Sequence, residues 1–494
     1  MLKSKFVKNI LFGFGGQLII IVLGIIVPRI MIDNYGSDVN GLISTVIQIF
    51  TYMALLEAGI GQAAKNLLYK PINEKDREGV SFIASVARSY FRKFTVYYAI
   101  GVVILSVVLP FVLKTNVGYF TVFLIVLFEG MSEVVSFYFI QTQTVILAAD
   151  GRGYVNNGVN VVNKVLSYTV KIVMAMLGVN IAFLQFIYFL ITVAKSVYYR
   201  LYFKRNYPWL NYTKAPSGTK LKDRNSYIIT EIAWAMFSST DMIVLSMFIS
   251  TQISSVYGIY NMVFTNLNVL LNAVYTSVNY TLGQTFHEDK EKYKKLHDAF
   301  TSIFMGTMTI LMCIAYVMIL PFVKLYTKGV TDVNYIYEYL PVMFCLVQII
   351  SWSRYISGNL TALAGYVKQT SRVSLIEALT NIVLSIVLVH KFGLIGVLAA
   401  TVIALPLKVI YCTYLSDKKI LNRSCWKTIS ILGINYLFFA AVVIGSRFIN
   451  IQMNSWGVFL KHGVIVSIIM VITGITLNIL VNRDCLNYIN RIKK

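Results

Sequence analysis

Long apolar stretches follow one another along almost the whole 494-residue chain, and they constrain its fold more than any other feature. A bilayer core of about 30 Å is crossed by a helix of about 20 apolar residues. By that measure the sequence predicts an all-α integral membrane protein with about fourteen transmembrane helices. The predicted spans are residues 10–31, 41–64, 94–113, 119–149, 154–177, 181–199, 227–250, 256–286, 300–323, 335–364, 370–389, 394–415, 428–448 and 457–481.

The composition supports this fold class. Hydrophobic residues make up 57% of the chain and charged residues 13%, with a mean hydropathy of +0.69. Average soluble domains are about 45–50% apolar and about 25% charged. A soluble protein of this composition would expose large apolar patches to water. These values exclude an ordinary cytosolic enzyme, a disordered chain and a small secreted scaffold.

Positive charge is concentrated on one predicted side of the membrane. The chain has 44 Lys and Arg against 21 Asp and Glu, a net charge of +23. With the N-terminus inside, alternate numbering of the loops places 32 basic residues in inside segments and 7 in outside segments. Cytoplasmic loops carry such an excess. We therefore predict a multi-pass protein of the bacterial cytoplasmic membrane, with both termini cytoplasmic and no nucleic-acid partner.

Short sequence repeats divide the chain into two halves. Three segments recur at similar offsets: 153–155 and 365–367, 195–198 and 408–411, and 39–42 and 256–259. Two pseudo-symmetric, MATE-like lobes of six helices would place substrate at the midplane between them; chance similarity among apolar helices is the alternative. The predicted domains are an N-terminal lobe (1–200), a cytoplasmic linker (201–226), a C-terminal lobe (227–415), and two further helices with a cytoplasmic tail (416–494).

Several charged residues are predicted to lie at bilayer depth, where charges are costly and face a cavity or one another. The predicted bases are Lys164, Lys171 and Arg354, and the predicted acids are Glu57, Glu129, Glu133, Asp241 and Glu377. One interpretation is structural pairing within each lobe, for example between Glu133 and Lys171 at similar depth. The other is a water-filled cavity in which these bases, with Arg29 and Trp352, hold an anionic head group. In that cavity the acids would gate the site or bind a coupling cation.

Sequence motifs for catalysis, metals and nucleotides are missing. There is no G-x-x-x-x-G-K-[ST], H-E-x-x-H or G-x-S-x-G pattern, so neither an ATP-driven pump nor an enzyme is favoured. The cysteines and histidines are dispersed and suggest no metal site. The outer acids Asp33 and Asp38 are typical of a capped helix end. We expect no resident cofactor, and sodium or proton coupling stays open.

Glycine and turn patterns resemble those of Wzx-type polysaccharide flippases, members of the multidrug/oligosaccharidyl-lipid/polysaccharide (MOP) exporter superfamily. The matching segments are Pro28-Arg29, Tyr35-Gly36, Asn40-Gly41-Leu42, Glu57-Ala58-Gly59-Ile60, Asp241 within residues 238–260, Ala364-Gly365 and residues 392–396. The same superfamily contains the multidrug extruders and the lipid II flippases. The similarity extends over nearly the whole chain and specifies the scaffold better than the substrate.

The resemblance implies movement of an undecaprenyl-diphosphate-linked oligosaccharide from the inner to the outer leaflet by alternating access, for surface polysaccharide assembly. Implied partners are this lipid-linked oligosaccharide, membrane lipids and other polysaccharide-assembly membrane proteins. Two alternatives stay open: a cation-coupled multidrug extruder of the MATE type, and, less favoured, a membrane glycosyltransferase or polymerase.

Overall fold

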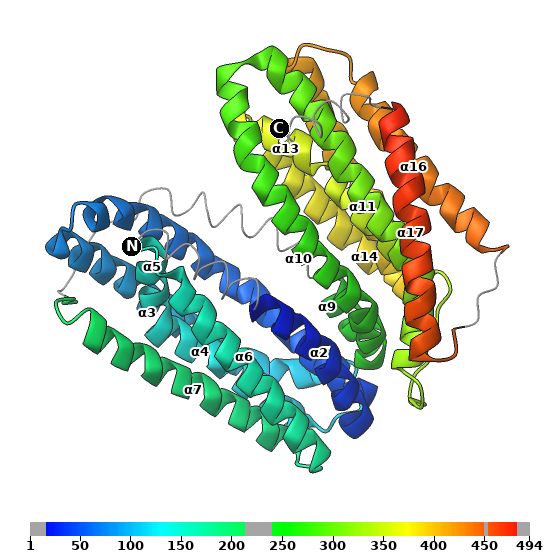
Figure 1. The fold of residues 1–494 in the computed structure, drawn as a ribbon. Helices are drawn as coiled ribbons and strands as arrows, with labels where there is room; N and C mark the ends of the chain where they lie inside the picture. Colours follow the sequence, from blue (N-terminus) through cyan, green and yellow to red (C-terminus); the bar gives the residue numbers. More distant parts are fainter. Residues whose placement is uncertain (1–15, 213–239, 449–452, 482–494) are drawn as a thin grey trace. The chain divides into compact units, whose positions relative to one another are not determined.

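The computed structural model describes residues 16–212, 240–448 and 453–481, and within these ranges the regular structure is entirely helical. The chain forms two compact units, Met1–Ser255 and Val256–Lys494, and each is described by itself. Figure 1 shows that both are bundles of long helices. An all-helical membrane protein is the fold class that the sequence predicts.

The first unit is built from helices, and short turns join those between residues 16 and 206. Its elements are α2 (Gly16–Asn73), α3 (Arg77–Val112), α4 (Tyr119–Val135), the π-helical segment η2 (Ser136–Ile140), α5 (Gln141–Ala149), α6 (Gly153–Met176), α7 (Ile181–Asn206) and α9 (Thr240–Phe248). Gly151 (φ +68°) and Gly178 (φ +66°) adopt left-handed conformations in the turns on either side of α6. Glycine is the residue that tolerates this conformation, and the sequence predicts turns at these two places.

Helix α3 shows why these helices require lipid around them. Tyr98 and Val102 are buried in the first unit, whereas Val96 and Ile100 are more than half exposed. Both faces of the helix are therefore apolar, which is typical of a helix whose outer face contacts lipid.

A polar joint connects α2 to the beginning of α10 (Thr251–Glu288). Asn40 donates a hydrogen bond to Ser255 Oγ at 2.8 Å. A Cβ atom on Gly41 would collide with the Thr251 carbonyl group and approach the Ser255 nitrogen to 2.9 Å. Asp38, predicted as a helix cap, instead accepts hydrogen bonds from the side chain of Thr251 and from the loop between α3 and α4. Gly41 thus permits a backbone approach that a larger residue would prevent.

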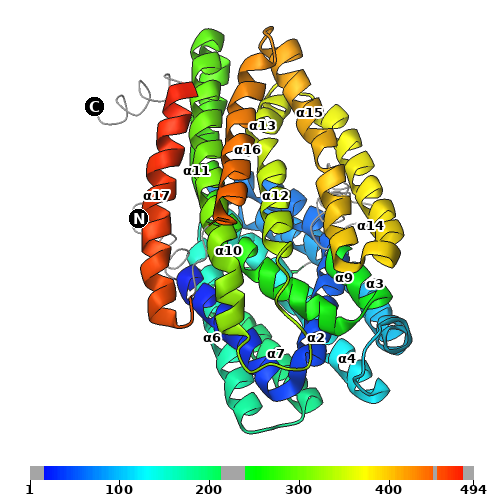
Figure 2. The ribbon, with the colours of Figure 1, turned by 90° about the vertical axis from the view of Figure 1, so that its right-hand side faces the viewer.

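The second unit contains the remaining helices. They are α10 beyond Ser255, α11 (Lys290–Tyr326), α12 (Leu340–Ser353), α13 (Tyr355–Leu363), α14 (Val367–Ala404), α15 (Pro406–Tyr414), the π-helical η3 (Leu415–Ile420), α16 (Trp426–Ser446) and α17 (Trp456–Val481). Helix α14 is broken at Gly393 (φ 57°). Helices α11, α16 and α17 lie side by side (Figure 2), and Asn435 and Asn478 are hydrogen-bonded between α16 and α17.

Nine helical segments in the described ranges are long and apolar enough to cross a membrane. Fourteen spans are not confirmed. Residues 367–420 count as one segment although Gly393 breaks it, and α6, with its lysines and asparagines, is not among the nine. Residues 213–226 of the predicted linker lie outside the described residues. Helix α9, which falls within the predicted C-terminal lobe, belongs to the first unit. The predicted domain boundaries therefore stay predictions.

Candidate functional site

Buried charges gather inside the first unit, where α4, α6 and α7 pack together. Glu129 on α4 and Lys171 on α6 are both buried and interact electrostatically. The Lys171 ammonium lies 4.5 Å from the centre of the Tyr188 ring on α7. A cation over an aromatic face is stabilised by the ring quadrupole. Lys171 therefore contacts one ring and interacts electrostatically with one carboxylate, which is Glu129 rather than the predicted Glu133.

Several buried polar atoms of the first unit have no hydrogen-bond partner among the described residues. They are Glu129 Oε2, Glu57 Oε1, Tyr98 Oη, Ser167 Oγ and both polar atoms of the Gln185 amide. Buried polar groups in proteins are nearly always satisfied by protein or by water, and at bilayer depth an unsatisfied one is costly. The interior of the first unit is therefore chemically suited to water or to a polar ligand.

Glu133 lies one helical turn from Glu129 and is half-buried. It interacts with Lys195 on α7 and with Lys164 on α6. Lys164 is exposed and lies 5.6 Å from the centre of the Tyr168 ring. Glu57 on α2 is near Gln141 at the start of α5. The structure thus brings together five of the predicted site residues, Glu57, Glu129, Glu133, Lys164 and Lys171, in one unit.

The second unit contains a separate buried ion pair. Arg354, at the junction of α12 and α13, donates from Nη1 to both carboxylate oxygens of Glu377 on α14, at 2.6 and 2.7 Å. Both side chains are buried. Lys408 on α15 interacts electrostatically with both of them. A predicted base and a predicted acid are therefore partners of each other here.

Trp352 is buried beside this ion pair. Its ring centre lies 4.1 Å from that of Tyr355, and its indole nitrogen donates to Asn268 at 2.8 Å. The rings of Phe304 and Tyr275 complete an aromatic cluster around it. Trp352 is thus fixed within the second unit by one hydrogen bond and three ring contacts.

The other two predicted site residues are Arg29 and Asp241. Arg29 on α2 forms an ion pair with Asp33 at 3.0 Å, one turn along the same helix. Asp241 is buried in the first turn of α9. Neither the cavity interpretation nor the pairing interpretation is tested by these positions, and the predicted roles of all ten residues stay predictions.

Lys195 interacts electrostatically with Glu133, and Lys408 with Glu377. The sequence relates these two lysines to each other, because they begin the repeated segments 195–198 and 408–411. In each unit the corresponding lysine therefore interacts with a carboxylate of that unit. Tyr188 and Gln141, by contrast, carried no signal in the sequence.

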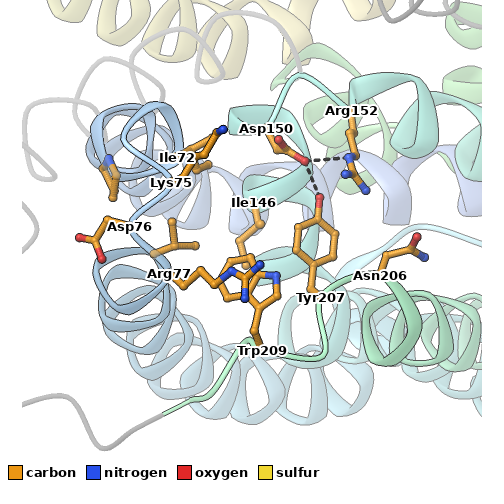
Figure 3. Close-up of a pocket in the computed structure, with 12 residues that line it drawn as sticks. Ile72, Lys75, Asp76, Arg77, Ile146, Asp150, Arg152, Asn206, Tyr207 and Trp209 are labelled. Atoms are coloured by element: carbon orange, nitrogen blue, oxygen red, sulfur yellow. Dashed lines mark hydrogen bonds and ion pairs between the residues drawn. The ribbon is translucent and has the colours of Figure 1, made fainter. Parts of the chain in front are cut away.

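A small polar cavity of about 240 Å³ lies at one end of the first unit (Figure 3). Asp150 accepts a hydrogen bond from Tyr207 at 2.7 Å and pairs with Arg152 at 2.8 Å. Burial, and then this hydrogen bond, raise the pKa of the Tyr207 phenol. The guanidinium of Arg77 lies 5.6 Å from the centre of the Trp209 ring. These side chains satisfy one another, so this cavity is a structural junction between the α5–α6 turn and the end of α7.

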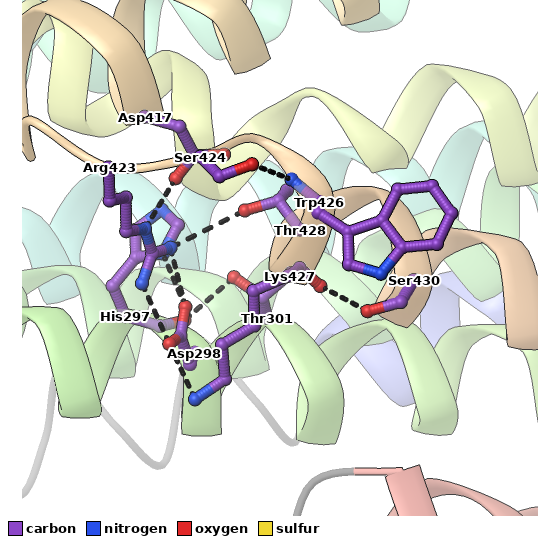
Figure 4. Close-up of polar contacts among 10 residues, drawn as sticks. All are labelled: His297, Asp298, Thr301, Asp417, Arg423, Ser424, Trp426, Lys427, Thr428 and Ser430. Carbon is purple, nitrogen blue, oxygen red and sulfur yellow. Dashed lines mark hydrogen bonds and ion pairs between the residues drawn. The ribbon is translucent and has the colours of Figure 1, made fainter.

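A second polar network joins α11, η3 and α16 (Figure 4). Arg423 donates to both oxygens of Asp298 at 2.6 and 2.7 Å and to Asp417 at 2.7 Å. Lys427 contacts Asp298 at 3.1 Å. Both carboxylates are nearly inaccessible to solvent. The network therefore fixes the start of α16 against α11.

No family model matches this sequence, and no curated protein matches it. Solved structures do share its fold. An inward-closed structure of the lipid II flippase MurJ has a TM-score of 0.66 and 12% identity, over 97% of this chain and 100% of that chain.

Multidrug transporters share the fold as well. An inward-facing multidrug resistance MATE family transporter of the MOP superfamily has a TM-score of 0.60 and 14% sequence identity, over 85% of this chain and 95% of that chain. The MATE multidrug transporter DinF-BH has a TM-score of 0.59 and 16% sequence identity, over 86% of this chain and 96% of that chain. The chain is therefore a multi-pass membrane protein with a MATE-like fold, as the sequence predicts.

Proposed function

We propose that this protein is a flippase that moves an undecaprenyl-diphosphate-linked oligosaccharide from the inner to the outer leaflet of the bacterial cytoplasmic membrane by alternating access. One observation carries the proposal: the lipid II flippase structure matches 97% of this chain, whereas MATE structures match 85% to 90%. The lipid II flippase structure therefore also matches part of the chain that those transporters leave unmatched. The fold itself is common to both classes.

The buried charges support an anionic substrate. The Lys171 ammonium lies over a ring face and interacts electrostatically with one carboxylate, and it has three N–H groups that can donate hydrogen bonds. A diphosphate offers several acceptor oxygens to such a donor. Unpartnered buried polar atoms inside the first unit are compatible with water around a sugar or phosphate group. The lipid tail of the substrate would stay in the bilayer.

A multidrug extruder is the second candidate, and one specific observation favours it. The predicted deep acids Glu57, Glu129, Glu133, Asp241 and Glu377 outnumber the predicted deep bases. Of these, Glu57 and Glu129 each have a buried oxygen without a hydrogen-bond partner among the described residues. Such carboxylates suit an organic cation or a coupling cation. In this function the protein would need no lipid-linked sugar.

A deletion strain separates the candidates. For the flippase we expect fully assembled undecaprenyl-diphosphate oligosaccharide to accumulate on the inner leaflet, with loss of surface polysaccharide. Drug sensitivity with normal surface polysaccharide would instead establish the extruder. Failure to assemble the repeat unit at all would indicate a glycosyltransferase and contradict both transport functions.

A further inference from the structure

A large basic cavity of about 910 Å³ lies within the first unit, bordered by α3, η2, α5 and α7. Its lining includes Arg88, Arg200 and Lys204, and the described residues that line it include no Asp or Glu. None of the ten predicted site residues belongs to it. The cavity is thus distinct from the group around Glu129 and Lys171.

Aromatic rings, rather than carboxylates, hold the arginines of this region. The Arg88 guanidinium lies 4.0 Å from the centre of the Tyr212 ring, and that of Arg92 lies 4.7 Å from the centre of the Tyr138 ring. A ring occupies the face of a guanidinium and leaves its N–H edge free to donate. Arg92 Nε is buried and has no hydrogen-bond partner among the described residues. The positive charge here is therefore not neutralised by the surrounding described residues.

The cavity changes character along α7. Val193 and Val197 line one part of it, and Arg200 and Lys204 line the next part toward the end of the helix. At 1.5 Å per residue, Val193 and Lys204 are roughly 16 Å apart along the axis. The charge distribution of the sequence predicts that this end of α7 is cytoplasmic. Along α7 the lining therefore passes from two valines and Ser196 toward the bilayer centre to Arg200 and Lys204 toward the cytoplasmic surface. This order matches the polarity of an inner-leaflet phospholipid.

We propose that this cavity binds an anionic membrane phospholipid. Arg88, Arg200 and Lys204 bind its phosphate, because basic pockets between membrane helices on the cytoplasmic side suit anionic head groups. The wall that includes Val197 and the half-exposed Phe139 contacts the acyl chain. A free phosphate ester shares the head-group chemistry but would gain nothing from this apolar wall. The proposal is independent of what the protein transports.

The test is lipid-dependent thermal stabilisation of the full-length protein purified in a neutral detergent. A ligand that binds only the folded state raises the melting temperature with its concentration. Dioleoyl phosphatidylglycerol is titrated, with phosphatidylcholine as the neutral lipid and glycerol 1-phosphate as the free phosphate ester. R200Q/K204Q removes two charges from the cavity. K93Q/R205Q removes two charges from exposed neighbours that do not line it and serves as the matched control.

We expect phosphatidylglycerol to stabilise the protein and phosphatidylcholine to have little effect. The apparent Kd for phosphatidylglycerol should rise at least about tenfold in R200Q/K204Q and stay within about twofold in K93Q/R205Q. An equal change in the apparent Kd for phosphatidylglycerol in the two double variants would contradict binding at this cavity. Equal stabilisation by phosphatidylglycerol and phosphatidylcholine would contradict it as well. Stabilisation by glycerol 1-phosphate at the concentrations where phosphatidylglycerol acts would overturn the lipid as its occupant. Because Arg200 and Lys204 are exposed, both variants are expected to fold.

Discussion

Arg354 and Glu377 neutralise each other inside the second unit through two hydrogen bonds from a single guanidinium nitrogen. This pairing changes what a mutation at either position measures. Removing one member of a buried ion pair leaves an uncompensated charge and costs about 3–5 kcal/mol. A transport defect in a single variant would therefore mix loss of stability with loss of substrate binding.

A double variant separates the two effects. We expect Arg354→Ala to lower the melting temperature and the abundance of the protein, because the buried Glu377 carboxylate loses its partner. Arg354→Ala with Glu377→Gln should restore part of both, since it removes that carboxylate but leaves the nearby charge of Lys408. If Arg354 binds the substrate, export of surface polysaccharide stays low in the double variant. Thermal melting and polysaccharide quantification in the same strains measure the two quantities. Full export by the double variant would show that the pair is structural.

Lys171 is the strongest candidate for contact with a substrate phosphate in the first unit. We expect Lys171→Ala to reduce export at least about tenfold, in line with loss of one charge-assisted hydrogen bond. Lys171→Arg should retain more activity because it keeps the positive charge. Lys70→Ala, at an exposed position of α2, is the control and should export normally. Normal export by Lys171→Ala at normal abundance would contradict a role in binding.

Gly41 tests the joint between α2 and the start of α10. Gly41→Ala would push a methyl group into the Thr251 carbonyl group, and overpacking costs about 1–3 kcal/mol. We expect a lower melting temperature. Gly24→Ala on the same helix meets no atom within 4 Å and should be neutral or stabilising, since alanine favours helix more than glycine does. Equal melting temperatures of the two variants would be inconsistent with the close approach.

The network around Arg423 should stabilise the packing of α16 against α11. Arg423→Ala leaves Asp298 and Asp417 without their shared guanidinium, and we expect a loss of about 3–5 kcal/mol. Lys427 also contacts Asp298, but its side chain is 46% exposed. Lys427→Ala should therefore cost less than about 1 kcal/mol. Chemical unfolding of both variants provides the comparison, and a larger effect for Lys427 would contradict this ranking.

The sequence predicted the fold class and the turns well because those features are local. Apolar runs of bilayer length give helices, and Gly151 and Gly178 end them where left-handed backbone is needed. It did not predict which charges meet. Glu129 and Glu133 share a face of α4, one turn of about 5.4 Å apart, so a small axial shift between helices decides which one Lys171 approaches. That shift depends on packing of all the neighbouring side chains, and so does the pairing of Arg354 with Glu377.

Reconstitution of the purified protein into liposomes tests the proposed function most directly. A fluorescent undecaprenyl-diphosphate oligosaccharide is placed in both leaflets, and a membrane-impermeant reductant quenches the outer leaflet. With an active flippase, all label in vesicles containing the protein becomes accessible within the assay, whereas about half remains protected in empty vesicles and in vesicles with Lys171→Ala. Protection of half the label in vesicles with the wild-type protein, under conditions where an organic cation is transported, would contradict the lipid flippase.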